Sequence, residues 1–279
     1  MNKSSLIIRF LYGTKLGNTC LKLMLSGRFD RVVISFLTSK CSRMIIPCYA
    51  KRHHIPLSRK QMKSYRTFRD FFVRKTRKAW IDIQYDHFIS PCDGWLSIYQ
   101  VEYDSTFVIK GKRYHLQDLI EDVELSNKYK DGICMIFRLE ASDYHHYCYI
   151  DHGYQGENHY IEGSLHSVQP KACEKYPVYT LNRRVWTLMT TEHFGPVVQV
   201  EIGAFAVGGI VNEKENARFL KGREMGHFEL AGSSIAVFIE NGRVELLPKI
   251  IQKLYFEEEI KVRQGMQIGT QIRKHNYRN

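Results

Sequence analysis

Short apolar runs and alternating apolar and polar stretches follow one another closely from Asp86 to the C-terminus. Glycine, asparagine and aspartate separate them, which favours turns, and a single short helix at about residues 115–125 interrupts the series. The clearest runs are residues 94–101, 106–109, 133–139, 197–202, 205–211 and 234–239. Strands at this spacing, without long helices between them, predict a mainly antiparallel β domain.

The N-terminal part has a different pattern. Apolar residues recur at helix-like spacing in residues 4–25 and 29–49, with Lys and Arg between them, as in amphipathic basic helices. An aromatic stripe follows at Tyr65, Phe68, Phe71 and Phe72, which at helical spacing is typical of core. We therefore predict an α+β protein. A basic, amphipathic helical region and linker occupy residues 1–80, and a mainly antiparallel β domain occupies residues 81–279.

The excess positive charge is confined to this N-terminal region. Residues 1–80 hold 19 Lys and Arg and only two acids, Asp30 and Asp70, whereas the remainder has 22 basic and 27 acidic residues. Such a segment binds an anionic membrane surface or nucleic acid, or is a solvated basic face without a partner. No recognised nucleic-acid module accompanies the charge, so we expect a membrane surface and no nucleic acid.

The seven cysteines are odd in number and form no CxxC pair, which argues against a disulfide framework or a cysteine-bound zinc and suits a reducing compartment. The apolar stretch at residues 6–11 is interrupted by Arg9 and is far shorter than the roughly 20 residues of a membrane-spanning helix. It also lacks a small-residue cleavage site, so we expect neither a signal peptide nor a transmembrane anchor.

Two segments carry titratable side chains in suggestive places. Asp93 lies in a turn between Pro91 and Gly94, where an aspartate ordinarily bonds its own backbone. Three histidines, His145, His146 and His152, fall within eight residues at the end of a predicted strand. They suit general acid–base chemistry or metal binding. Since no second cluster with ligand-like spacing supports a metal, we predict no metal site.

A third segment is the Gly232-Ser233-Ser234 turn, which leads into an apolar strand. By itself it is an ordinary turn. It is not the Gly-x-Ser-x-Gly elbow of α/β-hydrolases, because no second glycine follows.

Taken in order, the motifs resemble phosphatidylserine decarboxylase, particularly the bacterial branch with a long N-terminal helical region. No single motif is specific, but together they cover nearly the whole chain. The matching segments are residues 10–14, 68–75, 90–94, 109–114, 143–145, 200–204, 221–228 and 232–234.

The resemblance implies a proenzyme that cleaves its own Gly232–Ser233 bond, giving chains of residues 1–232 and 233–279 that stay associated. In this family the serine hydroxyl attacks the preceding carbonyl, the resulting ester breaks by β-elimination, and hydrolysis of the dehydroalanine leaves a covalent pyruvoyl group. This cofactor forms a Schiff base with phosphatidylserine. Release of CO2 then gives phosphatidylethanolamine, a step of phospholipid biosynthesis.

The resemblance also implies roles for individual residues. Ser233 is the pyruvoyl precursor, Asp93 and a histidine of the 143–145 segment are the charge-relay partners, and His145 is the proton donor in decarboxylation. Residues 81–279 would form the catalytic domain. The enzyme would lie peripherally on the cytoplasmic side of the cell membrane, and a homo-oligomer is compatible with the resemblance.

The sequence departs from the family pattern in the histidine segment. The family commonly reads Asp-Tyr-His-Arg-x-His, whereas here His146 replaces the arginine and Cys148 stands at the second histidine, which is often taken as the self-cleavage base. If so, His145, His146 or His166 must serve instead. The change also motivates an alternative, an inactive paralogue that keeps the fold and binds lipid or a partner enzyme.

Overall fold

The computed structural model describes residues 6–25, 27–75, 80–204, 209–230 and 233–272, with the side chains of residues 27–30 left out. It has an N-terminal layer of helices and a larger strand-rich part, which confirms the predicted α+β class.

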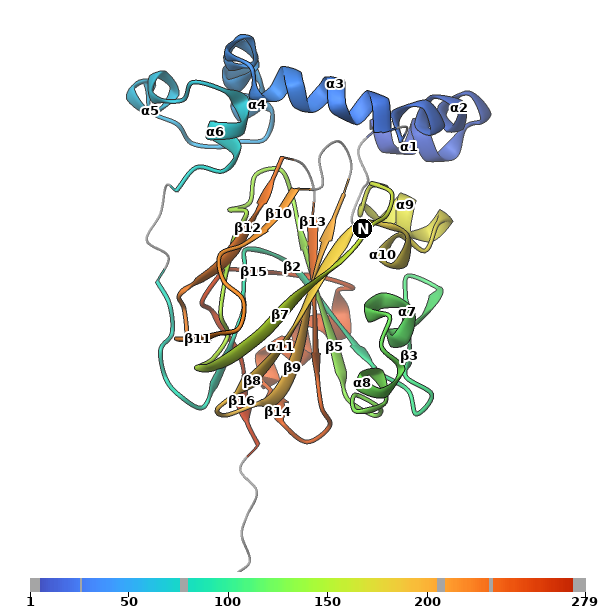
Figure 1. Ribbon diagram of the computed structural model, residues 1–279, viewed down its shortest axis with the longest axis vertical. Coiled ribbons are helices and arrows are strands. Elements are labelled where there is room, and N and C mark those ends of the chain that lie inside the picture. The colour runs from blue at the N-terminus through green and yellow to red at the C-terminus, as the bar shows by residue number, and fades with distance from the viewer. Residues whose placement is uncertain (1–5, 26, 76–79, 205–208, 231–232, 273–279) are drawn as a thin grey trace, which may run out of the picture.

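Six short α-helices and one 3-10 helix form a layer across one end of the β domain (Figure 1). We call residues 6–75 the helical layer. Its elements are α1 (Leu6–Gly13), α2 (Lys15–Met24), α3 (Gly27–Thr38), η1 (Lys40–Ile45), α4 (Ile46–Arg52), α5 (Arg59–Ser64) and α6 (Phe68–Phe72). Among the helices described, none is both long enough and apolar enough to cross a membrane.

Side-chain caps explain where the later helices of this layer begin. Ser58 and Gln61 form a capping box at the start of α5, and Thr67 and Asp70 form another at the start of α6. In each box the two side chains accept hydrogen bonds from backbone N–H groups that the first helical turn leaves without partners. These caps therefore fix the residues at which α5 and α6 begin.

The central sheet has eight antiparallel strands in the order β11-β7-β8-β9-β13-β5-β2-β15. Its strands are β2 (Gly94–Gln100), β5 (Ile133–Leu139), β7 (Gly153–Ile161), β8 (Arg184–Thr191), β9 (Gly195–Gly203), β11 (Ala217–Phe219), β13 (Ser233–Ile239) and β15 (Ile260–Val262).

Three smaller antiparallel sheets complete the strand-rich part: β1-β16-β14, β10-β12-β6 and the hairpin β3-β4. Their strands are β1 (His87–Ile89), β3 (Thr106–Ile109), β4 (Lys112–His115), β6 (His146–Cys148), β10 (Gly209–Asn212), β12 (Glu224–Glu229), β14 (Val244–Leu246) and β16 (Gln267–Gln271). The helices among the strands are α7 (Leu116–Ile120), α8 (Val123–Asn127), α9 (Pro170–Lys175), α10 (Val178–Leu181) and α11 (Pro248–Phe256).

The helix expected at residues 115–125 is in fact two short helices. Glu121 ends α7 in the left-handed conformation, with φ of 57°, and Asp122 then caps α8 by accepting a hydrogen bond from the Leu125 N–H. Of the expected strand at residues 205–211, the first four residues lie outside the described part, and β10 covers the rest.

Strand β13 is buried along its whole length at the centre of the large sheet. Its side chains alternate between two apolar clusters: Ile235, Val237 and Ile239 belong to one, and Ala236 and Phe238 to the other. Such two-sided burial explains why the sequence shows a continuous apolar run after Ser233 in place of the apolar–polar alternation of a half-exposed strand. Ser233 therefore begins a strand that its neighbours hold on both sides.

Candidate active site

Asp93 and Ser233 lie at the same end of the large sheet, where strands β2 and β13 begin. Strand β5 lies between β2 and β13 and runs antiparallel to both, so the start of each flanking strand lies beside the end of β5. Ser233 is paired with Leu139, while Trp95 is paired with Arg138. Neighbouring strands are about 4.8 Å apart, which places the two strand starts about 10 Å from each other.

Gly94 explains why the turn at Asp93 has its particular sequence. A Cβ at residue 94 would lie 3.0 Å from the carbonyl oxygen of Arg138, so a side chain there would crowd the backbone of β5. The glycine thus lets β2 approach β5 closely immediately after Asp93.

Ser233 is 1% exposed, and its Oγ has no hydrogen-bond partner among the described residues. Buried hydroxyls are almost always satisfied, so an unpaired one at a strand start is a candidate for a chemical role. Gly232, on the other side of the predicted cleavage bond, lies outside the described residues.

The chain reaches Ser233 through a strained residue. Leu230 follows β12 with φ of 52°, a left-handed conformation that costs an ordinary residue about 1–2 kcal/mol. Its side chain is buried with Phe68, Phe71 and Phe72 of α6. The helical layer therefore anchors the segment that leads to the predicted cleavage bond.

His145 is buried as a neutral base beside this segment. It is 1% exposed, and the backbone N–H of Phe228 donates to its carbonyl oxygen at 3.0 Å. Its Nδ1 lies 3.0 Å from the Asp143 carbonyl oxygen and must donate to it, which leaves Nε2 as an acceptor. Nε2 is buried and unpartnered among the described residues.

Burial, with a smaller contribution from the positive charges of Arg74 and Lys261, lowers the pKa of His145 to about 3, although the hydrogen bond to the Asp143 carbonyl acts in the opposite direction. The imidazole is therefore uncharged at neutral pH. Lys261 also holds the neighbouring Asp143 carboxylate, with its Nζ 2.7 Å and 2.8 Å from the two oxygens. Asp143 in turn supplies the carbonyl that fixes the tautomer of His145.

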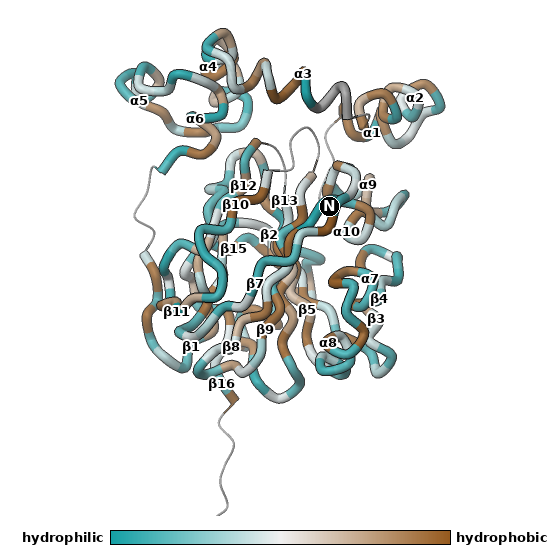
Figure 2. Tube along the Cα trace, in the orientation of Figure 1, coloured by the Kyte–Doolittle hydropathy of each residue, from teal (hydrophilic) through white to brown (hydrophobic). Residues whose placement is uncertain are grey.

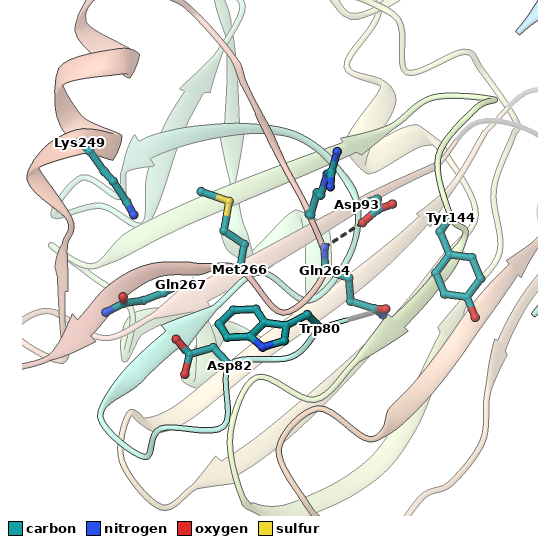
Figure 3. A pocket seen from close by; sticks show the side chains of 9 residues that line it. Trp80, Asp82, Asp93, Tyr144, Lys249, Gln264, Met266 and Gln267 are labelled. Atoms are coloured by element: carbon teal, nitrogen blue, oxygen red, sulfur yellow. Dashed lines mark hydrogen bonds between the residues drawn. The ribbon is translucent and has the colours of Figure 1, made fainter. Parts of the chain in front are cut away.

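Asp93 lies at the edge of a cavity of about 360 Å³ (Figure 3). One oxygen of its carboxylate accepts a hydrogen bond from the backbone N–H of Gln264 at 2.8 Å. The other residues lining the cavity are Trp80, Asp82, Tyr144, Lys249, Arg263, Met266 and Gln267. The expected relay contact from Asp93 is not formed, since neither Ser233 Oγ nor His145 Nε2 has a hydrogen-bond partner in the described part of the chain.

Comparison with known proteins supplies the deciding observation. The sequence profile of the family described as phosphatidylserine decarboxylase matches residues 68–270. The chain is 36% identical over 265 residues to "Phosphatidylserine decarboxylase proenzyme 2" of Clostridium acetobutylicum, covering 94% of this chain and 91% of that protein. The chain belongs to the phosphatidylserine decarboxylase family.

Two further relatives of the family show the same coverage. The phosphatidylserine decarboxylase proenzyme of Clostridium botulinum is 35% identical over 274 residues, which is 95% of this chain and 92% of the relative. That of Desulfitobacterium hafniense is 32% identical over 272 residues, covering 95% of this chain and 91% of the relative. The similarity thus includes the helical layer as well as the β domain.

Cys148, which stands at the second histidine of the family segment, lies beside the Asp93 turn. Its backbone N–H donates to the Pro91 carbonyl oxygen at 2.9 Å. Burial raises the pKa of the Cys148 thiol to about 12, and the negative charge of Asp93 contributes in the same direction. A thiol that stays protonated at neutral pH cannot take a proton from a serine hydroxyl.

The other two candidate histidines are occupied by partners. His146 lies with Nδ1 2.7 Å from Glu224 Oε1 and Nε2 3.1 Å from the Val73 carbonyl oxygen. His166 lies with Nδ1 3.2 Å from the hydroxyl of Tyr12 in α1. Of the three histidines that the sequence left open, His145 is the one with a buried ring nitrogen that lacks a partner.

Sequence reasoning missed several residues of this region. Phe72 was assigned to core packing, which the structure confirms, but its ring also lies over His145. Glu224 and His227 belong to the matching segment 221–228 but were given no role, although they lie beside His146. No local pattern signals these contacts, because each joins residues far apart in the sequence.

Proposed function

We propose that the protein is a self-processing phosphatidylserine decarboxylase that converts Ser233 into a covalent pyruvoyl group. The observation that carries the proposal is that Ser233 Oγ and His145 Nε2 are both buried and have no hydrogen-bond partner in the described part of the chain. A buried hydroxyl and a buried imidazole nitrogen without hydrogen-bond partners both lower the stability of the fold. Proteins tolerate such destabilising groups mainly at functional sites.

The first step is the attack of Ser233 Oγ on the carbonyl carbon of Gly232. The hydroxyl proton goes to a base, and the Gly232–Ser233 peptide bond becomes an ester, with the nitrogen of residue 233 leaving as an amine. Removal of the α-proton of residue 233 then expels the Gly232 carboxylate. The remaining dehydroalanine takes up water and loses ammonia, which leaves a ketone at the new N-terminus.

His145 is the base that we assign to this step. Its Nε2 is unprotonated, because Nδ1 carries the proton that it donates to the Asp143 carbonyl. The low pKa of His145 leaves Nε2 without a proton over the whole neutral range. The backbone N–H of Phe228, five residues before Ser233 in the chain, donates to the His145 carbonyl oxygen at 3.0 Å, which supports this assignment.

The residues present fit a pyruvoyl group at position 233, since the side chain there is enclosed and no other group uses its oxygen. Such a group supplies a carbonyl that condenses with the amine of phosphatidylserine and accepts the electrons released with CO2. In this step His145 would take up a proton at Nε2 and pass it to the carbon that loses the carboxyl group. The Phe72 ring lies against the imidazole and shields it from solvent.

We further propose that the helical layer binds an anionic membrane surface. Large apolar side chains are exposed on it, among them Leu6 at 81%, Leu16 at 68%, Val32 at 68% and Met44 at 82%. Hydrophobic segments are visible along α1 and α3 in Figure 2. Exposed basic side chains lie among them, including Arg9, Lys15 and Lys40. Apolar and cationic groups on one layer of helices are typical of attachment to the interface of an anionic bilayer.

Intact-mass measurement of the purified protein tests the processing proposal. We expect two chains, one ending at residue 232 and one beginning with a pyruvoyl group in place of residue 233. Ser233→Ala should remain a single chain and release no CO2 from phosphatidylserine, while His159→Gln, which changes an exposed histidine, should process normally. A wild-type chain that stays uncut and inactive under all conditions would instead favour an inactive, lipid-binding paralogue.

His145→Gln separates the assigned base from the nucleophile. This variant keeps Ser233 but has no basic ring nitrogen, so we expect self-cleavage slower by at least about a hundredfold, the range usual for loss of a general base. Wild-type cleavage in this variant would remove His145 from the mechanism while leaving the Ser233 assignment intact.

A further inference from the structure

Three potential metal ligands, none of them among the proposed catalytic residues, come together on two paired strands. His146 lies on β6, and Glu224 and His227 lie on β12. One ligand atom from each side chain lies within 4.8 Å of the other two. The strands pair antiparallel, with His146 directly opposite His227, so the backbone itself holds the two imidazoles together. Their rings stack with centroids 5.0 Å apart.

Both ring nitrogens of His146 face oxygen atoms that can accept a hydrogen bond, although a neutral imidazole has only one N–H to donate. A carbonyl oxygen only accepts, so Nε2 must donate its proton to Val73, whose carbonyl oxygen is 3.1 Å away. In a neutral ring Nδ1 then carries a lone pair. Yet Nδ1 lies 2.7 Å from Glu224 Oε1, which is also an acceptor. Either a second proton or a metal ion must therefore join these two atoms.

The arrangement at Val73 is the one that metal-bound histidines use. Such a histidine almost always donates its second ring N–H to a backbone carbonyl, a carboxylate or water, which fixes the tautomer and orients the ring. His146 is also 2% exposed, so its ring has little freedom to turn.

His227 adds a second open donor atom. Its Nδ1 is buried and has no hydrogen-bond partner in the described part of the chain. Glu213 Oε1 lies 4.0 Å from this nitrogen, beyond hydrogen-bond distance. The Glu213 side chain is 44% exposed and is free to rotate toward the cluster.

We propose that His146, His227 and Glu224 bind a divalent transition-metal ion, with Zn²⁺ the best match to two imidazoles and one carboxylate. Glu213 or a water molecule would complete four-coordination. With zinc–ligand distances of about 2.0–2.1 Å, the ligand atoms of a tetrahedral site lie about 3.3 Å apart. Glu224 Oε1 therefore has to move away from His146 Nδ1, which is now 2.7 Å from it, whereas the ligand pairs that are farther apart have to close. Lys75 holds the other oxygen of Glu224 at 2.9 Å and leaves Oε1 for the metal.

The position of this site gives the ion a structural role. It would tie β6 to β12 and, through the Val73 carbonyl, to the end of the helical layer. Strand β12 continues toward Ser233, so a bound ion would stiffen the segment that carries the predicted cleavage bond. The site does not depend on the proposed reaction, because the ligands are distinct from His145, Asp93 and Ser233.

Zinc titration of the full-length protein after removal of bound metal by a chelator tests the proposal. Calorimetry with ZnCl2 should show one ion bound per chain, and binding should weaken by at least about tenfold in His227→Gln and in Glu224→Gln. The matched control is His193→Gln, since His193 pairs with one carboxylate, Asp151, at 2.9 Å. A Cys41→Ser, Cys48→Ser double variant controls for the exposed thiols.

The outcomes are distinct. Thermal unfolding identifies a variant that fails to fold. If His227→Gln does not fold, Glu224→Gln still tests the site, because the Glu224 side chain is partly exposed and its replacement disturbs the fold less. Cobalt substitution should give the visible absorption of a nitrogen and oxygen site without a sulfur-to-metal charge-transfer band. The proposal would be overturned if the wild type bound no zinc, if both ligand variants bound zinc as tightly as the wild type, or if binding were lost with the thiols; a protonated His146–Glu224 pair would then remain.

Discussion

The phenyl ring of Phe72 lies over the imidazole of His145, with the ring centroids 4.3 Å apart and the planes inclined by 44°. Phe72 is the last residue of α6 and is 2% exposed. This contact joins the helical layer to the predicted base, and it accounts for part of the burial that lowers the pKa of His145 to about 3. Removal of the ring should therefore change the chemistry of His145 as well as the stability of the fold.

Phe72→Ala should admit water to His145 and move its pKa upward, toward the ordinary value of about 6.5. The rate of self-cleavage in a cell-free translation should be independent of pH between about 5 and 8 for the wild type. In Phe72→Ala the rate should fall as the pH drops below about 6.5, because the base becomes protonated.

The matched control for this experiment is Phe68→Ala. Phe68 belongs to the same apolar cluster and is 5% exposed, so its loss removes comparable packing, roughly 3–5 kcal/mol. It should nevertheless keep the pH profile of the wild type. Identical profiles in the two variants would show that Phe72 does not set the protonation of His145.

Cys148→Ala should process at a rate within a few-fold of the wild type. The buried thiol has a pKa of about 12, so it holds its proton at neutral pH and contributes no base. Time courses of short-chain formation, followed by mass spectrometry, compare this variant with His145→Gln. If Cys148→Ala were as slow as His145→Gln, the base would have to be assigned to the thiol after all.

The strands of the β domain were largely predictable from the sequence. The expected limits of β3 and β5 agree with the structure to the residue. Most residues of both strands are buried, so the apolar run in the sequence begins and ends where the strand does. The α7–α8 pair was merged into one helix, since a single left-handed residue, Glu121, leaves little trace in the apolar pattern.

The candidate site could be proposed from the sequence as a set of residues but not as an arrangement. Asp93, His145 and Ser233 were proposed because the ordered motifs resemble the family, whereas the relative placement of Asp93 and Ser233 depends on the strand order β13-β5-β2. The His146–Glu224 contact joins residues 78 positions apart, and it depends on a register that shifts at an irregularity in β12. Strand order and register are set by the packing of the whole domain, so motif spacing does not contain them.

The buried carboxyl of Glu201 makes the free energy of unfolding depend on pH. It is 0% exposed in the middle of β9, where burial raises the pKa of its carboxyl to about 7. The pKa in the folded state is above the ordinary value of about 4.5. Its contribution to stability is therefore fully present below pH 4.5 and is lost as the pH rises through about 7.

Denaturant unfolding of the wild type and of Glu201→Gln at pH 4.5 and pH 8 measures this term. Glutamine does not titrate, so the difference in unfolding free energy between the two proteins should shift by roughly 3 kcal/mol across this range, at about 1.4 kcal/mol for each pH unit. The shift should favour the variant at pH 8. Any constant effect of the amide on the hydrogen bonds from Gln199 and Asn212 cancels in this comparison. A difference that is the same at both pH values would contradict the buried-acid assignment.

Binding of the helical layer to membranes should combine charge and apolar insertion. Sedimentation with vesicles that contain phosphatidylserine should show binding that weakens as salt rises, since surface charges are screened within about 8 Å at physiological ionic strength. Replacement of Leu16, Val32 and Phe36 by serine should weaken vesicle binding by at least about tenfold. The apolar side chains gain free energy when they move from water into the membrane interface, and serine does not.

The matched control replaces exposed apolar residues outside the helical layer. Tyr255 and Phe256, at the end of α11, are 84% and 77% exposed, so Tyr255→Ser with Phe256→Ser removes a similar apolar surface from the β domain. This variant should bind vesicles like the wild type. Equal losses in the two sets would mean that apolar exposure in general drives the sedimentation. Binding that is the same with and without phosphatidylserine would show that the basic side chains of the layer, such as Lys15 and Lys40, do not select anionic lipid.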